Sequence, residues 1–345
     1  MNQQTNLNQF NYELMEEKSV PQNGFYKSIE INKENTFLLA STDITINVFV
    51  FQQGFIKLIS QLQGHRNYVT SLKFLNKKSR FLSGSLDKSI IIWSQQLLAN
   101  QKYIQKIKDH QNPIVALVIH PNIENMFISA SYRQILFYQY SSQKQWICLQ
   151  KITEIDGIFG LSINENGTKI VLCSENHIIV ILELQQLIQQ QKSDQIWIVK
   201  QKIKVRQWGF RVCFLNNDTF VFQPVSKNWN GTSHLNVYTL NKLNEFKIQR
   251  KIPIKGGGNF CINNFPSQYN KQKYILLVKN GNYINLFKYT EGKFRLKYKQ
   301  ALCFDITKIY GTLSQDGEYL ITWDEKQRQI QIRKYTELKK IQTIE

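Results

Sequence analysis

The stretch from Gly64 to Trp93 decides the fold of this chain. It reads GHRNYVTSLKF at 64–74, LNKKSRFL at 75–82 and SGSLDKSIIIW at 83–93. The pattern predicts a first strand that begins near Val69, a polar turn around Asp87 and a third strand at Ile90–Trp93. The stretch therefore predicts a compact antiparallel β unit.

This stretch resembles a WD40 repeat, the unit that builds one four-stranded blade of a β-propeller. The resemblance implies a buried hydrogen-bonded set made by the histidine of the Gly-His pair, a strand serine, the turn aspartate and the late tryptophan. In this sequence these residues are His65, Ser83 or Ser85, Asp87 and Trp93. The resemblance also implies a non-catalytic scaffold that presents peptides and protein surfaces.

A partial copy of the pattern follows about one repeat length downstream. Asp109-His110 stands where Gly-His is expected, and Tyr138 takes the place of the tryptophan. The turn aspartate is missing, with Arg133 nearby. Beyond this point the pattern fades, so further blades are predicted from apolar strands and from tight-turn pairs such as Asn166-Gly167.

Seven first strands and seven third strands are placed in this way. We therefore expect an all-β fold, a seven-bladed WD40-type β-propeller of four-stranded antiparallel blades. The first strands are predicted to begin near Tyr26, Val69, Ile114, Ile158, Phe210, Phe260 and Lys308. Residues 1–24 are expected to form a polar, partly flexible segment before a single propeller domain at 25–345. The expected blades span residues 25–63, 64–108, 109–155, 156–206, 207–256, 257–304 and 305–345.

Two parts of this arrangement stay open. Either an N-terminal strand at Phe10–Leu14 or residues 338–344 complete the last blade. Residues 184–193, which are rich in glutamine, form either a short helix or a loop in the fourth blade. The literal Trp323-Asp324 pair is assigned to a second strand, with Trp323 in the core.

The chain has 44 Lys and Arg against 25 Asp and Glu, a formal net charge of +19. Many cations alternate with apolar residues along the predicted fourth strands of blades four to six. Lysines on outer strands protect a sheet edge from pairing with other chains. The alternative is a basic belt that binds RNA, anionic lipid or an acidic protein segment through counterion release. Its members are Lys200, Lys202, Lys204, Arg206, Lys247, Lys251, Arg295, Lys297 and Lys299.

Location is predicted from what the sequence lacks. It has no run of 18 or more apolar residues, and its first residues lack the basic and apolar regions of a secretory signal. The five cysteines are isolated from one another, as in proteins of a reducing compartment. We therefore expect no membrane span and no secretion, and a cytoplasmic protein, with the nucleus as the alternative.

The motifs of catalysis are missing from the sequence. The five histidines do not stand at metal-binding spacing. The triplet Gly256–Gly258 lacks the Lys-Ser/Thr of a phosphate-binding loop and precedes a predicted strand. There is no Gly-x-Ser-x-Gly nucleophile elbow. We expect no enzyme activity, no metal site and no cofactor.

The expected function is protein–protein interaction through propeller loops, by a monomer or by a subunit of a larger complex. Tryptophan and arginine dominate interface hot spots, so contacts with a protein or peptide partner are assigned to Arg66, Arg133, Trp208, Arg211 and Trp229. Nucleic-acid binding through the basic belt is the alternative function. A third alternative is a scaffold for iron–sulfur protein assembly, because residues 129–132 (SASY) and 145–148 (QWIC) resemble one blade of that family.

Overall fold

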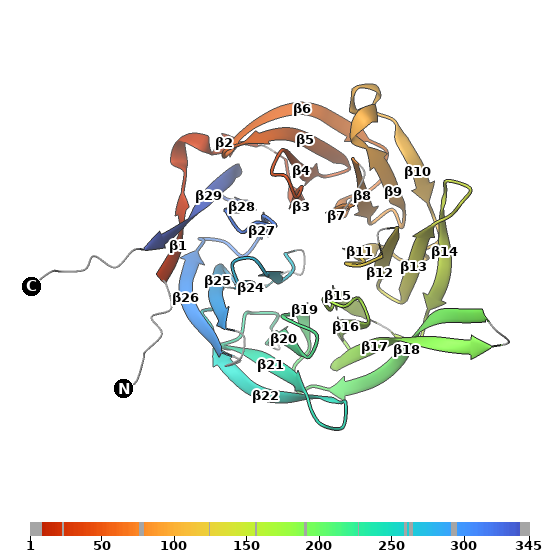
Figure 1. Ribbon diagram of the computed structural model, residues 1–345. Helices are drawn as coiled ribbons and strands as arrows, with labels where there is room; N and C mark the ends of the chain where they lie inside the picture. Colours follow the sequence, from red (N-terminus) through yellow and green to blue (C-terminus); the bar gives the residue numbers. More distant parts are fainter. Residues whose placement is uncertain are drawn as a thin grey trace, which may run out of the picture.

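The computed structural model describes residues 9–338 apart from 23, 76–78, 124, 156, 190–191, 227, 259–260, 262–264 and 291–294. In this part of the chain the strands form seven antiparallel sheets, arranged as a ring around a central axis (Figure 1). Six sheets have four strands and the seventh has five. The predicted all-β, seven-bladed propeller is confirmed.

The first three blades follow one another along the chain, and each begins with its innermost strand. Blade one consists of β3 (Tyr26–Ile31), β4 (Phe37–Thr42), β5 (Thr45–Gln52) and β6 (Phe55–Gln63). Blade two consists of β7 (Val69–Phe74), β8 (Arg80–Ser85), β9 (Ile90–Ser94), the short 3-10 helix η2 (Gln95–Asn100) and β10 (Tyr103–Ile107). Blade three consists of β11 (Ile114–Ile119), β12 (Met126–Ser131), β13 (Gln134–Tyr140) and β14 (Trp146–Ile152).

The next three blades keep the same order. Blade four consists of β15 (Ile158–Ile163), β16 (Lys169–Ser174), β17 (Ile178–Gln189) and β18 (Lys192–Lys204). Blade five consists of β19 (Gly209–Phe214), β20 (Thr219–Pro224), β21 (His234–Leu240) and β22 (Phe246–Pro253). Blade six consists of β23 (Gln268–Asn270), β24 (Ile275–Asn280), β25 (Tyr283–Thr290) and β26 (Arg295–Cys303).

Blade seven is built from both ends of the chain. It consists of β27 (Ile309–Leu313), β28 (Tyr319–Asp324), β29 (Gln329–Leu338), β1 (Gln9–Leu14) and the short β2 (Val20–Pro21), with the 3-10 helix η1 (Glu16–Lys18) between β1 and β2. The strand β1 pairs antiparallel with β29, from Gln9 opposite Leu338 to Leu14 opposite Arg333. Of the two alternatives for the last blade, the structure has the N-terminal strand. Residues 9–21 thus lie within the propeller, and not in a segment before it.

The N-terminal strand β1 is held by side-chain contacts as well as by its backbone pairing with β29. Phe10 and Tyr12 are each only 2% exposed. The Tyr12 hydroxyl donates to the Gly317 carbonyl at 2.7 Å. The side chain of Gln300 on blade six accepts from the Tyr12 N–H at 2.9 Å and donates to the Tyr12 carbonyl at 3.3 Å. Because β1 pairs with β29 and also contacts blade six, it covers an edge that would otherwise be open to other chains.

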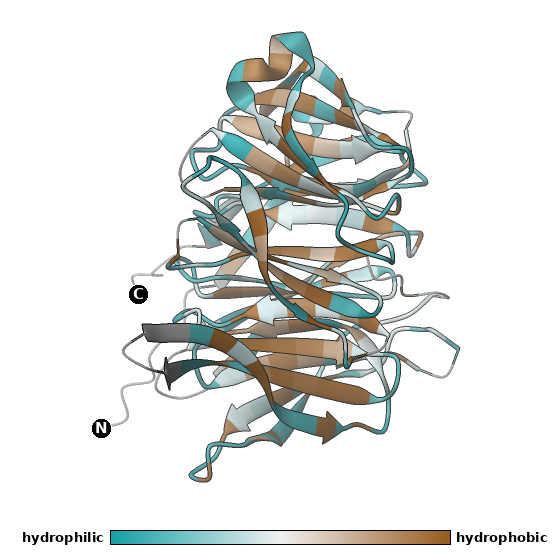
Figure 2. Cartoon of the chain, turned by 90° about the vertical axis from the view of Figure 1, so that its right-hand side faces the viewer, coloured by the Kyte–Doolittle hydropathy of each residue, from teal (hydrophilic) through white to brown (hydrophobic). Residues whose placement is uncertain are grey.

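The hydrophobic core is divided among the interfaces between blades. Each of seven buried clusters in the described residues joins two neighbouring blades, the last one joining blades seven and one. Strands β12, β20 and β24 are buried at every residue because they have neighbours on both faces. Apolar strands therefore alternate with polar turns, as Figure 2 shows. This explains why the second and third strands read as continuous apolar runs.

Three local expectations can be compared with the structure. Residues 184–189 continue β17 and pair with β18, so the predicted helix or loop is wrong and an extended hairpin stands there. Blade six begins at Gln268, later than predicted, and Phe260 lies outside the described residues. Trp323 is 1% exposed in the second strand of blade seven, as predicted.

Candidate functional site

In blade two, His65 is hydrogen-bonded on both sides of its ring. Its Nε2 lies 2.7 Å from the Ser83 Oγ, and its Nδ1 lies 3.1 Å from the Asp87 Oδ2. The Trp93 Nε1–H donates to the same Ser83 hydroxyl at 2.8 Å. Since a carboxylate can only accept, we assign the proton of a neutral His65 to Nδ1, with Ser83 donating to Nε2. A continuous chain thus links the third strand to the turn.

Asp87 organises the loops at this end of the blade. It accepts from the Arg66 N–H at 2.9 Å and from the Ser89 hydroxyl at 2.6 Å. Burial acts to raise its pKa, but hydrogen bonds from His65, Ser89 and the Arg66 N–H outweigh burial and lower the pKa below its usual value. Ser85 lies beside this chain, where its hydroxyl accepts from the Asp87 N–H at 3.0 Å. The arrangement has a structural role, because the hydrogen-bonding groups of its members are paired with one another.

Blade three keeps only half of this network. His110 Nε2 lies 2.6 Å from the Ser129 Oγ, as in blade two. Gln134 accepts from the backbone N–H of residue 111 at 3.2 Å, in place of the missing carboxylate. The Tyr138 hydroxyl donates to Asp109 at 3.2 Å. Burial, reinforced by Lys151, lowers the pKa of His110 to about 4, so this histidine is neutral at neutral pH.

One end of the ring carries the candidate site. Because the blades are antiparallel, connections into the first strands and turns between second and third strands lie at the same end. We call this end the Trp229 face. In blades two to five it comprises residues 64–68, 86–89, 109–113, 132–133, 153–157, 175–177, 205–208 and 225–233, of which 156 and 227 are not described.

Five aromatic rings pack together on the Trp229 face, across three blades. Trp208 lies 5.1 Å from Trp229, 4.9 Å from Phe210 and 5.5 Å from Phe159, between ring centroids. Tyr132 of blade three extends the group, 6.1 Å from Phe159. The Trp208 contacts with Trp229 and Phe210 are edge-to-face, a favoured geometry for aromatic rings. We call these five residues the aromatic cluster.

Trp229 is the most exposed member of the cluster, with 46% of its surface accessible. Its backbone has a φ of +62°, in the left-handed region that bulky residues seldom adopt. The loop holds this conformation through the Trp229 N–H, which donates to the Ser226 carbonyl at 2.9 Å. The Cys261 N–H donates to the Trp229 carbonyl at 2.6 Å, from the connection to blade six. The ring is therefore presented by a fixed backbone.

The five predicted partner contacts do not form one group. Trp208 and Trp229 belong to the aromatic cluster. Arg133 is exposed in the same turn as Tyr132, whereas Arg66 is exposed on blade two. Arg211 was predicted to be a surface contact, but it is only 1% exposed, because its strand β19 turns the side chain into the protein.

Three members of the cluster were missed by sequence reasoning: Tyr132, Phe159 and Phe210. Phe159 and Phe210 each stand one residue after the start of a first strand, in blades four and five. An aligned comparison of the first strands would have shown this repeated aromatic position. Tyr132 gave no such signal.

The predicted basic belt lies on the outermost strands of blades four to six, in β18, β22 and β26 and just beyond β18 (Figure 1). Lys200 lies 3.6 Å from Glu183, and Lys247 lies 3.3 Å from Glu245. Lys299 is half-buried, and burial and its neighbour Lys297 lower its pKa. The exposed members with no acidic partner in the described chain are Lys202, Lys204, Arg206, Lys251 and Lys297, while the side chain of Arg295 is not described.

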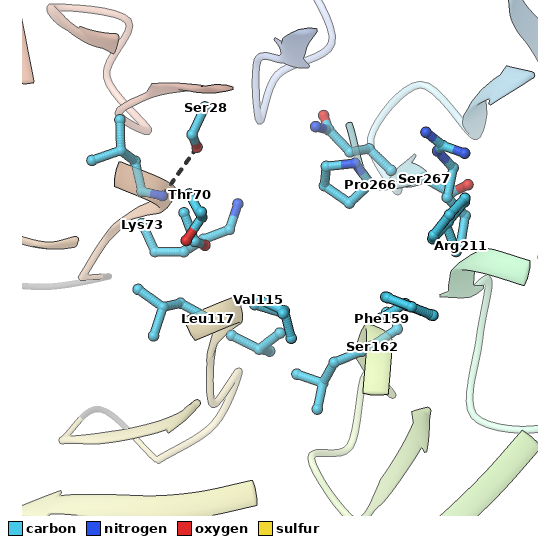
Figure 3. A pocket seen from close by; sticks show the side chains of 18 of the residues that line it. Ser28, Thr70, Lys73, Val115, Leu117, Phe159, Ser162, Arg211, Pro266 and Ser267 are labelled. Atoms are coloured by element: carbon cyan, nitrogen blue, oxygen red, sulfur yellow. Dashed lines mark hydrogen bonds between the residues drawn. The ribbon is translucent and has the colours of Figure 1, made fainter. Parts of the chain in front are cut away.

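A cavity of about 220 Å³ lies at the centre of the ring, among the first strands (Figure 3). Lys73 and Glu30 form an ion pair in it, with the nitrogen 2.8 Å from the carboxylate. Ser28 Oγ accepts from the Leu72 N–H at 3.1 Å. Phe159 and Phe210 also line this cavity, so the aromatic cluster extends from the cavity to the outer loop. Ligand pockets are usually about 300–1,000 Å³, larger than this cavity.

The described residues hold no group of three or more His, Cys, Asp or Glu side chains placed to bind a metal ion. In the same residues, no helix is both long and apolar enough to cross a membrane.

Comparisons with known proteins agree with this geometry. The protein-family model "WD domain, G-beta repeat" (WD40) matches residues 56–94, which include the His65 network. A chain in the crystal structure of a mitotic checkpoint complex superposes with a TM-score of 0.71 over 97% of this chain and 95% of that chain. The sequence identity is 12%, so that likeness concerns the fold alone. The matched repeat and the seven blades define a WD40-type β-propeller.

Relatives with similar sequences match only part of the chain. Pre-mRNA-processing factor 19 of Oryza sativa subsp. japonica is 30% identical over 121 residues, 35% of this chain and 22% of that protein. Pre-mRNA-processing factor 17 of Homo sapiens is 27% identical over 107 residues, 31% of this chain and 18% of that protein. The aligned part is thus about a fifth of either relative.

Proposed function

We propose that this protein is a non-catalytic scaffold that docks a protein or peptide segment on the aromatic cluster of the Trp229 face. The observation that carries the proposal is the exposed Trp229 ring, held at 46% exposure by a backbone with positive φ. A large apolar ring presented to water in a costly conformation is a feature that binding explains and folding alone does not.

The surroundings of Trp229 suit an interface hot spot. Its rings are backed by Phe210, which is 3% exposed, so the site is rigid before a partner arrives. Half-buried Trp208 and Phe159 form the flanks. An anchor of this kind typically contributes about 2 kcal/mol or more to binding. The rings contact one another directly, so the cluster offers an apolar ridge, and not an open cage for a cation.

The test compares Trp229→Ala with Leu243→Ala. Leu243 is 74% exposed in the turn between β21 and β22, at the other end of the same blade. Proteins that co-purify with the wild type are quantified by mass spectrometry. We expect Trp229→Ala to lose at least one reproducible partner more than tenfold and Leu243→Ala to keep it. Equal retention of every partner by both variants would remove the docking role.

A second candidate function is polyanion binding by the basic belt. The observation that favours it is the set of exposed cations on outer strands that have no acidic partner in the described chain, such as Lys202 and Lys204. A titration with single-stranded RNA at rising salt tests it, because each phosphate contact adds about 0.7 to the salt slope for single strands. Binding that weakens steeply with salt, and weakens further in Lys202→Gln/Lys204→Gln, supports the belt. Binding that is absent or independent of salt leaves edge protection as the role of these lysines.

The names of the relatives support a proposal for the kind of assembly in which the scaffold acts. Both relatives described above carry names of pre-mRNA-processing factors. We therefore place the proposed scaffold in an RNA-processing assembly, which makes the nucleus the preferred location over the cytoplasm. Fractionation of cells with an antibody to this chain checks the location, and a purely cytoplasmic signal would contradict it. An iron–sulfur assembly role has no support in the described structure.

A further inference from the structure

A polar pocket at the outer edge of the Trp229 face lies beside the His65 network. It has a volume of about 370 Å³ and lies between residues 64–66, the turn at residues 87–89 and residues 103–108. Figure 1 shows β9 and β10, which precede and follow η2, side by side in the outer part of blade two. The volume falls within the range of about 300–1,000 Å³ that is usual for ligand sites. We call it the blade-two pocket.

The blade-two pocket carries an excess of positive charge. Three cations and one carboxylate line it, namely Arg66, Lys106, Lys108 and Asp87, so two positive charges are in excess at neutral pH. Arg66 and Lys108 are exposed, and neither side chain has an acidic partner in the described chain. The Asp109 carboxylate accepts from the Tyr138 hydroxyl instead, and it is not among the described residues that line the pocket.

Lys106 is held in place before a ligand arrives. Its Nζ donates to the Gly64 carbonyl at 2.7 Å and lies 3.5 Å from the Asp87 Oδ2. A Cβ at residue 64 would come within 2.9 Å of the Trp93 ring, so this carbonyl belongs to a loop that packs closely on blade two. An ammonium has three N–H donors, and the described residues account for two of them. A fixed cation therefore keeps one donor for a ligand.

The negative charge of Asp87 is already used within the blade. Its oxygens accept from the Arg66 N–H at 2.9 Å, from the Ser89 N–H at 2.9 Å and from the Ser89 hydroxyl at 2.6 Å. His65 Nδ1 lies 3.1 Å from the same carboxylate. Because these donors surround Asp87, its charge is compensated inside the blade, and the Arg66 and Lys108 side chains stay available to an anion.

The excess charge matches a phosphate group better than a carboxylate. A phosphorylated side chain carries about −1.5 to −2 charges and three acceptor oxygens at neutral pH, whereas a carboxylate carries one charge on two oxygens. A guanidinium binds phosphate through two parallel N–H groups, and lysine binds it as a point charge. Single-stranded nucleic acid is bound along a groove of cations that follows its backbone. The blade-two pocket instead gathers its cations at one point, as a single phosphate on a peptide requires.

We propose that the blade-two pocket binds the phosphate of a phosphorylated side chain in a partner protein, with Arg66, Lys106 and Lys108 as its contacts. The proposal goes beyond docking on the aromatic cluster and uses none of the residues of that cluster. Without the phosphate, the two cations in excess have no anion to pair with, so phosphorylation of the partner controls this contact.

The test measures the binding of three fluorescent pools of short peptides to the full chain. The pools share randomised flanks and differ only in a central phosphoserine, glutamate or serine. We expect the phosphoserine pool to bind about tenfold more tightly than either other pool, because hydrogen bonds between charged groups are the strong ones. The preference is expected to disappear in Arg66→Gln/Lys108→Gln. It is expected to persist in Lys88→Gln/Lys102→Gln, which removes the same charge from exposed lysines of blade two that do not line the pocket.

A measurement on the wild type covers the case in which the double variant does not fold. Hydrogen exchange at residues 64–68 and 86–89 is expected to slow when the phosphoserine pool is added, while the turn at residues 241–245 of blade five exchanges as before. Unchanged exchange at both blade-two loops would overturn the proposal.

Two results of the binding assay would also overturn it. One is equal binding of the three pools, or a phosphoserine preference that Arg66→Gln/Lys108→Gln keeps. The other is binding of single-stranded RNA, but not of the phosphoserine pool, that this double variant loses. Trp229→Ala is expected to keep the phosphoserine preference, so the assay fails separately from the co-purification that tests docking.

Discussion

Blades two and five carry different side chains at equivalent positions of their second and third strands. In blade two, Trp93 stacks on Phe81 with ring centroids 6.2 Å apart and donates to Ser83. In blade five, Tyr238 stacks on Phe220 at 4.8 Å, and Phe222 occupies the place of Ser83. Blade two thus holds its loops with a hydrogen-bonded network of polar side chains. Blade five has aromatic rings at the equivalent positions.

The two blades also differ in how their loops are held. The loops of blade two are bonded to their own turn by Asp87, and they have little freedom to change. The Trp229 loop of blade five is instead bonded to the connection of the next blade, at Cys261. The loss of the repeat signature therefore coincides with an exposed aromatic surface.

The largest effect in this comparison is expected for Trp93→Ala. The side chain is 1% exposed, so its removal leaves a large cavity and takes away the N–H donor to the Ser83 hydroxyl. A loss of about 3–5 kcal/mol in the free energy of unfolding is expected, measured by urea denaturation. A loss below 1 kcal/mol would mean that neighbouring blades, and not this network, hold blade two.

Asp87→Asn tests the charged member of the network. The folded protein holds the pKa of Asp87 below its usual value, so the stabilisation is complete above about pH 4 and is lost as the pH falls through the lower folded pKa. The variant is expected to lose about 1.5–3 kcal/mol at pH 7 and to show a weaker acid dependence than the wild type. Acid titrations followed by circular dichroism check this, and parallel curves for both proteins would contradict it.

His65→Ala is expected to cost about 1–3 kcal/mol, because it removes one buried hydrogen-bond partner each from the Ser83 hydroxyl and the Asp87 carboxylate. His177→Ala is the control, since His177 is exposed in the turn between the second and third strands of blade four. Chemical denaturation of both variants gives the difference. Equal stability of the two variants would show that the imidazole of His65 contributes nothing specific.

The smallest effect on stability is expected for Trp229→Ala in blade five. Its ring keeps nearly half of its surface in water and makes edge contacts with Trp208. A cost of about 0.5–1 kcal/mol is expected, and the same denaturation assay measures it. A loss as large as that of Trp93→Ala would show that Trp229 is a structural residue. The docking proposal would then lose the observation that supports it.

Much of the fold was predictable because apolar runs and turns recur along the chain. First strands were predicted at Val69, Ile114 and Ile158, and the structure starts them there. The repeat pattern also named His65 and its partners. Arg211 was placed at the surface because a sequence shows residue type but not the side of the strand on which a residue lies.

The aromatic cluster could not be found in the same way. Its members come from positions 132, 159, 208, 210 and 229, which approach one another only because three blades are adjacent in the ring. Contacts between residues far apart in sequence leave no local pattern to read.

The sequence by itself determined the strand order, the blade number and the one complete WD40 repeat, because these depend on local periodicity and turn chemistry. The tertiary structure alone decided that β1 completes the last blade, because the contacts of β1 with β29 and with Gln300 of blade six join residues far apart in the sequence. It also decided which side chains lie on the Trp229 face. Those side chains come together when the blades close into a ring, and their separation along the sequence does not show which of them will meet.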